Sequence, residues 1–561
     1  MKRKFVNIVI GGEAGQGLVT LGQILAKSLV RSGYSIVVTQ DYQSRIRGGH
    51  NTFAIRVGVD EVIAPQEKID LLVALNEETV ALHREELVPK GLIVTDEAFD
   101  TDDGATLSVP FKQLSADQYS NTAAMGVVAA LLGLDLQLVV RTVENLFGKA
   151  HHNVVEENRR ILEQSFDWAS EHSERFERLT PIPDPPQRLI MNGNEAIALG
   201  ALTAGLKFYA FYPMTPSTSI GLMLARWAKE MGLVVEQAED EIAAINMALG
   251  ASFAGVPSMV GTSGGGFALM VEGVSLAAMT ETPVVIVVAQ RPAPATGLPT
   301  RTEQADLEFV LHAGHGEFPR AIFAPGTVEE CFYLIRKALE LAEKFQGPIF
   351  VLTDQFIADS YRAVNPFEIR NLASVQPWAF KELTFASPYQ RYACTDTGIS
   401  PRLLPGLTEK LVVADSDEHT EDGHITEDLS VRINMVQKRL KKGAGIRKEV
   451  VPPELQGDKD PDLLMICWGS SKGATLEAAS MMRSDGRRTA TMHFQQVWPL
   501  VPEQFMQHLQ QANQIVCVEG NANGQLARLI RRETGFSIEN RVLRYDGLPI
   551  TPEYILRQMN Q

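Results

Sequence analysis

Short runs of aliphatic and β-branched residues alternate with helical stretches along most of the chain. In the first 180 residues this alternation predicts strands at 5–12, 34–42, 51–58, 71–76 and 92–98, and helices at 18–31 and 122–148. Strands that alternate with helices are typical of an α/β fold, so we expect a largely parallel sheet here.

A second α/β pattern covers residues 188–370 and follows a proline-dense stretch. The segment PIPDPPQ at 181–187 cannot hold a helix, and it predicts a linker at 181–189. The predicted strands of the second pattern lie at 207–213, 232–238, 257–263, 283–290, 320–325 and 348–354. The predicted helices lie at 194–205, 240–255, 267–280 and 327–345. We therefore expect a second domain at 190–370.

The regular alternation stops at residue 371 and returns at residue 456. The region between, 371–455, holds an acidic run at 415–428 and a basic, helical run at 431–442. It predicts an extended connector that wraps a neighbouring domain, and partial disorder is the alternative because hydrophobicity is low. The third pattern predicts strands at 462–470, 490–495 and 514–520 and helices at 472–482, 502–511 and 524–533. The chain as a whole predicts three α/β domains with mostly parallel sheets, at 1–180, 190–370 and 456–561.

Charge, apolar runs and cysteine usage exclude several functional classes for this protein. The net charge of −16 and the lack of a basic stripe disfavour a role with nucleic acid. No apolar run is long enough to span a bilayer, and the basic N-terminal tip flows into a glycine loop, which indicates a first strand and no signal peptide. The four cysteines are far apart. Such cysteine usage predicts a reducing, cytoplasmic location and no iron–sulfur cluster held by this chain alone.

The most informative stretch is residues 209–250. A predicted strand stops at Tyr212-Pro213 and opens a hydroxyl-rich turn that contains Thr215. Further along, Glu241 opens an apolar helix of small residues. A carboxyl in such surroundings is poorly solvated, its pKa rises, and it could serve a nitrogen base on a cofactor. The alternative is an ordinary N-terminal acid favoured by the helix dipole.

Two glycine loops in the first domain could bind an anion. The loop GGEAGQG places Gly12, Gly15 and Gly17 between a strand and a helix, where backbone N–H groups can hold a phosphate. Its spacing differs from the dinucleotide fingerprint, and a tight turn without a ligand is the alternative. The loop SRIRGGH adds Arg45 and Arg47, which suit a coenzyme phosphate or form a solvated basic loop.

Two further stretches carry charged candidates. The proline-braced loop at 289–307 follows a predicted strand, and its Arg291 and Arg301 could each hold a substrate carboxylate through a bidentate fork or lie on the surface. In the acidic run, His419 and His424 stand among carboxylates. A metal site is conceivable there, but a solvated charge cluster fits such a run better.

Several of these stretches occur together in one family. The chain resembles the fused gamma–alpha subunit of the 2-oxoacid:ferredoxin oxidoreductases, most closely the 2-oxoglutarate type. The matching stretches are GGEAGQG, SRIRGGHNTFAIRVG, GNEAIALGAL, YPMTPST, EDEIAAINMALGASFAG, TSGGGFALMVEG, TGLPTRTEQADL and VEGNANGQL. The pieces YPMTP and EDEIAA, at their mutual distance, are the most specific, and the resemblance covers nearly the whole chain.

The resemblance implies a thiamine-diphosphate enzyme whose cofactor lies between this subunit and a separate beta subunit. Glu241 would contact the aminopyrimidine N1′, with Tyr212 and Pro213 beside the cofactor, and Thr215 would bond the 2-oxoacid. An arginine of the 291–301 loop would hold the substrate carboxylate. The loop has alanines where the family has a glycine and a serine, which leaves the choice between Arg291 and Arg301 open.

The resemblance also implies the reaction and the partners. A 2-oxoacid, with 2-oxoglutarate as the expected one, would be decarboxylated oxidatively to an acyl-coenzyme A with electrons passed to ferredoxin, or formed by the reverse carboxylation. The glycine loops of a gamma-type first domain would contact coenzyme A, and the last domain is similar to the transketolase C-terminal domain. The chain has no diphosphate-binding GDG motif and no cysteine cluster, so Mg²⁺ and a [4Fe–4S] cluster are expected in the beta subunit, within an (alpha–beta)₂ assembly.

Two other functions stay open from the residues alone. Asp41 lies where a ribose-binding acid of a nicotinamide dehydrogenase would lie, although the glycine spacing opposes this function. A non-catalytic scaffold that binds coenzyme A is the other alternative. The chain by itself is expected to be inactive in the leading hypothesis.

Overall fold

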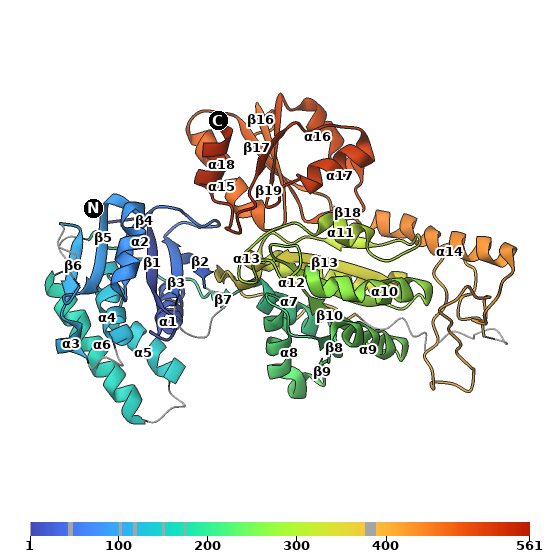
Figure 1. Ribbon diagram of the computed structural model, residues 1–561, viewed down its shortest axis with the longest axis horizontal. Coiled ribbons are helices and arrows are strands. Elements are labelled where there is room, and N and C mark those ends of the chain that lie inside the picture. The colour runs from blue at the N-terminus through green and yellow to red at the C-terminus, as the bar shows by residue number, and fades with distance from the viewer. Residues whose placement is uncertain are drawn as a thin grey trace. The chain divides into compact units, whose positions relative to one another are not determined.

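The computed structural model describes residues 2–42, 49–99, 104–115, 120–147, 152–172, 176–375 and 389–560. These residues form three β-sheets in two compact units. The first unit contains residues 1–192 together with 359–367 and 551–554, and the second contains 193–358, 368–550 and 555–561. Both units alternate strands with helices (Figure 1).

The first unit is built on an eight-stranded sheet of order β6-β5-β4-β1-β3-β2-β14-β7. Its strands are β1 (Phe5–Glu13), β2 (Ser35–Asp41), β3 (His50–Gly58), β4 (Ile69–Ala74), β5 (Leu87–Asp96), β6 (Thr106–Val109), β7 (Leu189–Met191) and β14 (Arg362–Val364). β1 pairs in parallel with β4 but antiparallel with β3, and β3 pairs antiparallel with β2. We expected a largely parallel sheet in the first 180 residues. This expectation is wrong for the part of the sheet formed by β1, β3 and β2, which is antiparallel.

The helices of the first unit are α1 (Leu18–Arg31), α2 (Glu77–His83), α3 (Phe111–Leu114), α4 (Ser120–Leu132), α5 (Leu136–Phe147) and α6 (His152–His172), with a short 3₁₀ turn at Arg84–Glu86. The single helix predicted at 122–148 is two helices. Gly133, with a φ of 74°, follows the last residue of α4 in a left-handed conformation that glycine adopts without strain. The chain then turns before α5 begins.

The second unit holds a seven-stranded sheet of order β18-β12-β13-β11-β10-β8-β9. Its strands are β8 (Phe208–Phe211), β9 (Val234–Gln237), β10 (Ser258–Thr262), β11 (Val284–Gln290), β12 (Ala321–Phe323), β13 (Pro348–Asp354) and β18 (Gln496–Trp498). Every residue of β11 and β13 is buried, as expected for central parallel strands covered on both faces.

Seven helices accompany this sheet (Figure 1): α7 (Gly193–Ala204), α8 (Thr218–Met231), α9 (Glu241–Phe253), α10 (Gly264–Met279), α11 (Leu307–His312), α12 (Val328–Phe345) and α13 (Gln355–Asp359). β8, β10 and β11 are parallel neighbours, so their carboxyl ends meet at one edge of the sheet. The turn after β8, the start of α10 and the loop after β11 all begin at this edge.

A five-stranded sheet completes the second unit, in the order β15-β17-β16-β19-β20. Its strands are β15 (Glu454–Gly457), β16 (Leu463–Trp468), β17 (Thr489–Phe494), β19 (Gln514–Glu519) and β20 (Asn540–Leu543). Its helices are α15 (Lys472–Ser484), α16 (Met506–Gln511), α17 (Gln525–Thr534) and α18 (Pro552–Met559), with 3₁₀ turns at Gly469–Ser471 and Pro502–Gln504. One hydrophobic core runs from this sheet into the seven-stranded one.

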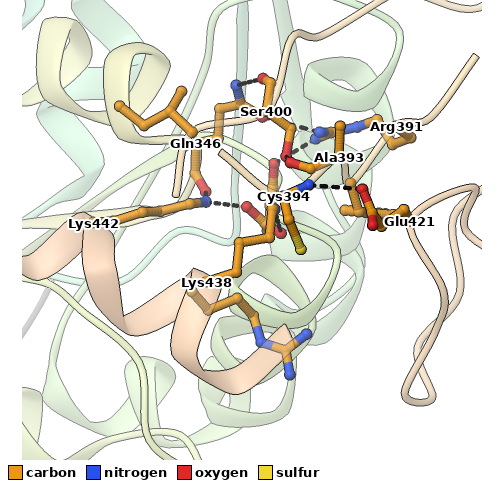
Figure 2. A network of polar contacts seen from close by, with 12 residues as sticks. Gln346, Arg391, Ala393, Cys394, Ser400, Glu421, Lys438 and Lys442 are labelled. Carbon is orange, nitrogen blue, oxygen red and sulfur yellow. Dashed lines mark hydrogen bonds and ion pairs between the residues drawn. The ribbon is translucent and has the colours of Figure 1, made fainter. Parts of the chain in front are cut away.

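Residues 389–448 tie the second unit together through buried charges and end in α14 (Leu429–Lys448). Glu281, just after α10, is 0% exposed; Lys438 and Lys442 of α14 both pair with its carboxylate. Arg391 donates to the backbone oxygen of Glu281 at 2.8 Å, and Lys442 to the backbone oxygen of Gln346 at 3.1 Å. Figure 2 shows these cations arriving from two segments of the connector. A buried carboxylate needs such partners, so this contact fixes the connector to α10.

The acidic run at 415–428 packs against other residues of the same connector. His419 is buried, its ring lies 4.0 Å from that of Tyr392 between centroids, and its Nδ1 bonds the backbone oxygen of Asp417 at 3.0 Å. Glu418 pairs with Arg432 and Arg439. These contacts give the run a structural role in the described part of the chain.

Most strand pairs of the described residues are parallel, and all three sheets carry helices, which confirms the predicted α/β fold class. No helix among the described residues combines the length and the apolarity needed to cross a membrane.

Candidate active site

The first turns of α9 and α10 meet at a buried carboxyl. Glu241 is the first residue of α9, and the Asp240 side chain caps this helix by accepting from the Ala243 N–H at 2.7 Å. Glu241 is only 3% exposed, and burial raises its pKa. Its Oε1 has no hydrogen-bond partner among the described residues. An unpaired buried oxygen is costly, so a hydrogen bond to a ligand or a water would stabilise this atom.

Glycine is required opposite this oxygen. A Cβ at Gly266, in the first turn of α10, would stand less than 3.0 Å from both Oε1 of Glu241 and Oγ1 of Thr262. The next glycine differs, because a Cβ at Gly265 would meet only the backbone oxygen of Ala295, at 3.6 Å. The triple glycine therefore forms a cradle whose third position faces Glu241.

A second buried carboxyl faces the same helix start, and the sequence did not single it out. Asp306, 8% exposed, lies where a Cβ at Gly264 would stand, and its Oδ2 has no partner among the described residues. Burial raises the pKa of Asp306 to about 6 and that of nearby Glu303 to about 7. The Oγ of Ser263 is also buried and unpaired in the described structure. The only local signal for Asp306 was its place in the TEQADL stretch.

The turn after β8 is held from inside the protein. The buried Asn194, at the start of α7, donates from Nδ2 to the Pro216 oxygen at 2.8 Å and to the Ser219 hydroxyl at 2.7 Å. Ser217 donates to the Met214 oxygen at 2.8 Å. These bonds fix the backbone on both sides of Thr215.

The structure brings Arg291 and Thr215 together. Nη1 of Arg291 donates to the backbone oxygen of Thr215 at 2.8 Å, and this arginine is 8% exposed. Arg301 lies at the other end of the loop: a Cβ at Gly547 would stand 3.1 Å from Cβ of Arg301, and Thr302 N–H donates to the Gly547 oxygen at 3.1 Å. The two predicted arginines thus have different surroundings.

Large apolar side chains on the same two helices are exposed. Ile242 and Met247 of α9 and Leu269 of α10 are each at least 42% exposed, and Tyr212 on the turn after β8 is 40% exposed. Exposed apolar side chains on two neighbouring helices are typical of a surface that another protein covers.

The predicted glycine loop lies in the first unit. Gly15 and Gly17 have φ of 102° and 76°, and α1 begins directly after Gly17 without a side-chain cap. A Cβ at Gly17 would clash with the Asn121 amide at the start of α4. A Cβ at Gly12 would contact the side chains of Leu75 and Gln16. Two helix starts therefore converge on this loop, which is the geometry of an anion site. Arg45 and Arg47 lie outside the described residues.

A cavity of about 140 Å³ opens at the same end of this sheet. It is lined by Ala74, Leu75, Asp96, Phe99, Phe111, Lys112, Ser115 and Ser120. Leu75 is shared with the surroundings of Gly12, so cavity and glycine loop are neighbours.

One further cluster has the composition of a metal site. Ligand atoms of Glu330, Glu454 and His493 lie within 4.8 Å of one another. The Lys472 ammonium stands 2.5 Å from Glu330 Oε1 and 2.6 Å from Glu454 Oε2. A built-in cation therefore already balances these carboxylates.

Comparisons with known proteins identify the family of this chain. The family described as pyruvate flavodoxin/ferredoxin oxidoreductase, thiamine diP-bdg, matches residues 199–438, and the family pyruvate ferredoxin/flavodoxin oxidoreductase matches residues 7–168. The 2-oxoacid:ferredoxin oxidoreductase subunit alpha of Saccharolobus solfataricus is 31% identical over 97% of this chain and 96% of its own. The chain belongs to the 2-oxoacid:ferredoxin oxidoreductase alpha subunits.

Other members and a solved structure support this family. The 2-oxoglutarate oxidoreductase subunit KorA of Mycobacterium tuberculosis is 26% identical over 94% of this chain and 88% of its own. The solved 2-oxoglutarate:ferredoxin oxidoreductase from Magnetococcus marinus, with 2-oxoglutarate, coenzyme A and succinyl-CoA bound, has a TM-score of 0.93 and 28% identity, covering 100% of this chain and 99% of that chain. The resemblance inferred from the sequence is confirmed. The family favours the 2-oxoacid:ferredoxin oxidoreductase over the nicotinamide dehydrogenase and the non-catalytic scaffold.

Proposed function

We propose that this alpha subunit completes a thiamine-diphosphate-dependent 2-oxoacid:ferredoxin oxidoreductase that uses 2-oxoglutarate and coenzyme A. The observation that supports the proposal most is the buried, unpartnered Oε1 of Glu241 over the Gly266 cradle. Relatives named for 2-oxoglutarate, and a similar structure solved with that substrate, support the substrate class.

The residues present fit the aminopyrimidine of thiamine diphosphate. That ring carries a basic nitrogen, and Glu241 offers an oxygen without a partner in surroundings that favour its protonated form. Gly266 leaves room for the carboxyl, and the proposal places the planar ring beside this carboxyl at the start of α10. When bound, thiamine diphosphate supplies the electron sink that lets a 2-oxoacid lose CO₂.

The chain's own residues then hold the proton and the substrate. Glu241 would hold a proton between Oε1 and the nitrogen of the bound ring, which would determine which nitrogen of that ring is basic. Arg291 fixes the Thr215 backbone through Nη1, and its remaining N–H groups are available to a carboxylate. The Thr215 hydroxyl would donate to the 2-oxo group of the substrate.

The site needs a second subunit. The four cysteines are free thiols: Cys331, Cys467 and Cys517 are buried and Cys394 is exposed. The beta subunit would supply the [4Fe–4S] cluster and the Mg²⁺ that holds the diphosphate, and it would cover Ile242, Met247 and Leu269. Ferredoxin as acceptor, an (alpha–beta)₂ assembly and a cytoplasmic location complete the proposal.

The first unit would serve coenzyme A. Gly12, Gly15 and Gly17, with the uncapped start of α1, would hold its phosphates, joined by Arg45 and Arg47. We keep the division into a gamma-type domain at 1–180, a pyrimidine-binding domain at 190–370 and a transketolase C-terminal-like domain at 456–561 as part of this proposal.

The test compares the chain alone with the chain co-purified with its beta subunit. CO₂ release and viologen reduction are measured on 2-oxoglutarate with coenzyme A and thiamine diphosphate. We expect activity from the complex and none from the isolated chain. Full activity of the isolated chain, or a complex that is inactive with every 2-oxoacid, contradicts the proposal.

A further inference from the structure

The loop at 289–307, which carries Arg291 and Asp306 and is called the substrate loop below, is held in place by hydrogen bonds to the C-terminal five-stranded sheet. Gln304 is buried, and partners beyond residue 460 meet all four of its polar groups. Its N–H donates to the Gly520 oxygen at 2.6 Å, and its Oε1 accepts from the Gly520 N–H at 2.8 Å. Its Nε2 donates to the Trp468 oxygen at 2.9 Å, and its backbone oxygen accepts from Asn521 Nδ2 at 3.2 Å.

A second glutamine holds the other side of Asp306. Gln525, the first residue of α17, is 7% exposed. Its Nε2 donates to the Ala305 oxygen at 2.7 Å, and its Oε1 accepts from the Glu308 N–H at 3.0 Å. One amide therefore bridges a carbonyl before Asp306 and an N–H after it. Both hydrogen bonds need the amide, because a carboxylate has no donor and an apolar side chain has neither group.

The residues that hold the loop are themselves fixed. The buried Glu519 carboxylate accepts from Trp468 Nε1, from Asn521 Nδ2 and from the Leu526 N–H, at 3.0, 3.0 and 2.9 Å. Asn521 Oδ1 accepts from the Gly524 N–H at 2.8 Å. A fully satisfied buried network of this kind is rigid, so it can serve as an anchor.

The anchored segment leads directly into the site. The Asp306 N–H donates to Gln290 Oε1 at 2.9 Å, and Gln290 immediately precedes Arg291. The Asp306 carboxyl lies over Gly264, two residues from Gly266 and its Glu241 contact. Arg291 reaches the Thr215 oxygen. The anchor and the substrate-side groups are thus joined by one short, hydrogen-bonded stretch.

We propose that Gln304 and Gln525 form an amide clamp through which the C-terminal sheet positions the substrate loop and sets the affinity for the 2-oxoacid. The inference rests on the proposed function for the identity of the substrate. Neither glutamine reaches the reacting atoms, so both are positioning residues. A loop held in its binding conformation loses less conformational freedom when the substrate binds.

Two variants and one control test the clamp in the complex with the beta subunit. Gln525→Met keeps the side-chain length but removes both bonds, and Gln525→Glu keeps the acceptor for Glu308 and loses the donor for Ala305. Gln511→Met makes the same chemical change at an exposed glutamine of α16 in the same sheet's helical layer. The readouts are KM and kcat for 2-oxoglutarate, thiamine-diphosphate affinity by calorimetry, and hydrogen exchange of peptides covering 303–308.

We expect both Gln525 variants to raise KM by about tenfold, with kcat and cofactor affinity within about threefold of wild type. Exchange over 303–308 should accelerate in both, and Gln511→Met should match wild type. A wild-type KM with accelerated exchange overturns the proposal. So does rapid exchange of the 303–308 amides in the substrate-free wild-type complex, a result that does not depend on any variant folding. A wild-type complex without turnover would instead refute the proposed function.

Discussion

The Oε1 of Glu241 and the Cα of Gly266 are packed so closely that a Cβ at Gly266 would stand less than 3.0 Å from the carboxyl oxygen. Glu241 begins α9 and Gly266 lies in the first turn of α10, so the fold brings two helix starts to one atom. In the proposed function, the unpaired oxygen and the missing side chain belong to one feature, the contact with the aminopyrimidine ring.

Gly266→Ala should therefore weaken the binding of thiamine diphosphate. The added methyl group displaces the Glu241 carboxyl and fills the cradle, so we expect thiamine-diphosphate affinity of the complex to fall by at least about tenfold, by calorimetry. Gly265→Ala is the matched control, because its Cβ would meet only the Ala295 oxygen at an ordinary 3.6 Å. Equal affinities for the two variants would refute the role of the cradle.

Variants of the two arginines of the substrate loop should differ in their KM for 2-oxoglutarate. Arg291→Lys loses the planar fork and the bond to the Thr215 oxygen, and we expect KM for 2-oxoglutarate to rise by about tenfold or more. Arg301→Lys, against the Gly547 turn, should change KM by less than about threefold. The reverse order of effects would assign the carboxylate to Arg301.

Asp306 should make stability depend on pH. Burial raises its pKa to about 6, whereas an unfolded aspartate titrates near 4. Between about pH 4 and 6 the folded chain keeps a proton that the unfolded chain has released, so stability falls as pH rises through this window and the loss is complete above it. Asp306→Asn should remove this loss and stabilise the ligand-free chain by about 2 to 3 kcal/mol near pH 7.

Denaturant melts of wild type and Asp306→Asn, from about pH 4 to 8, measure this difference. The two proteins should converge at the acidic end and separate on the alkaline side. A constant difference across the range would mean that the Asp306 carboxyl is not the titrating group.

The buried carboxylate of Glu281 should be essential for folding stability. Burial alone would raise its pKa, but Lys442 and Lys438 outweigh burial and hold the pKa well below its usual range. Such a group stabilises the fold above its unfolded pKa, and the stabilisation is lost as pH falls toward the folded value. Glu281→Gln leaves buried ammonium groups unpaired, and we expect a loss of about 3 to 5 kcal/mol in urea melts near pH 7.

The matched control is the exposed ion pair Asp462–Arg488. Asp462→Asn should leave the free energy of unfolding nearly unchanged, because solvent screens an exposed ion pair. Similar losses for both variants would show that the Glu281 contact has no special weight in the second unit.

The sequence predicted the elements whose signal is local. Helix α1 has the predicted bounds of 18–31, because a glycine loop begins it and an apolar stripe runs through it. Strands such as β11 stand out as continuous β-branched runs. Glu241 could be singled out because its poor solvation follows from its own neighbours in the chain.

Features that depend on distant segments escaped prediction. β14 joins the first unit's sheet, and β18 joins the seven-stranded one, from far along the chain, and three residues give too weak a local pattern. The importance of Asp306 arises from Gly264, some forty residues earlier, and that of Gln304 from Gly520. Register and burial are set by tertiary packing, which periodicity cannot reveal.

The most direct test of the central claim is 2-oxoglutarate- and coenzyme A-dependent viologen reduction by the Glu241→Ala complex at saturating thiamine diphosphate. We predict a fall in kcat of about a hundredfold or more, with subunit assembly and melting behaviour like wild type. Turnover equal to that of the wild-type complex would contradict the account.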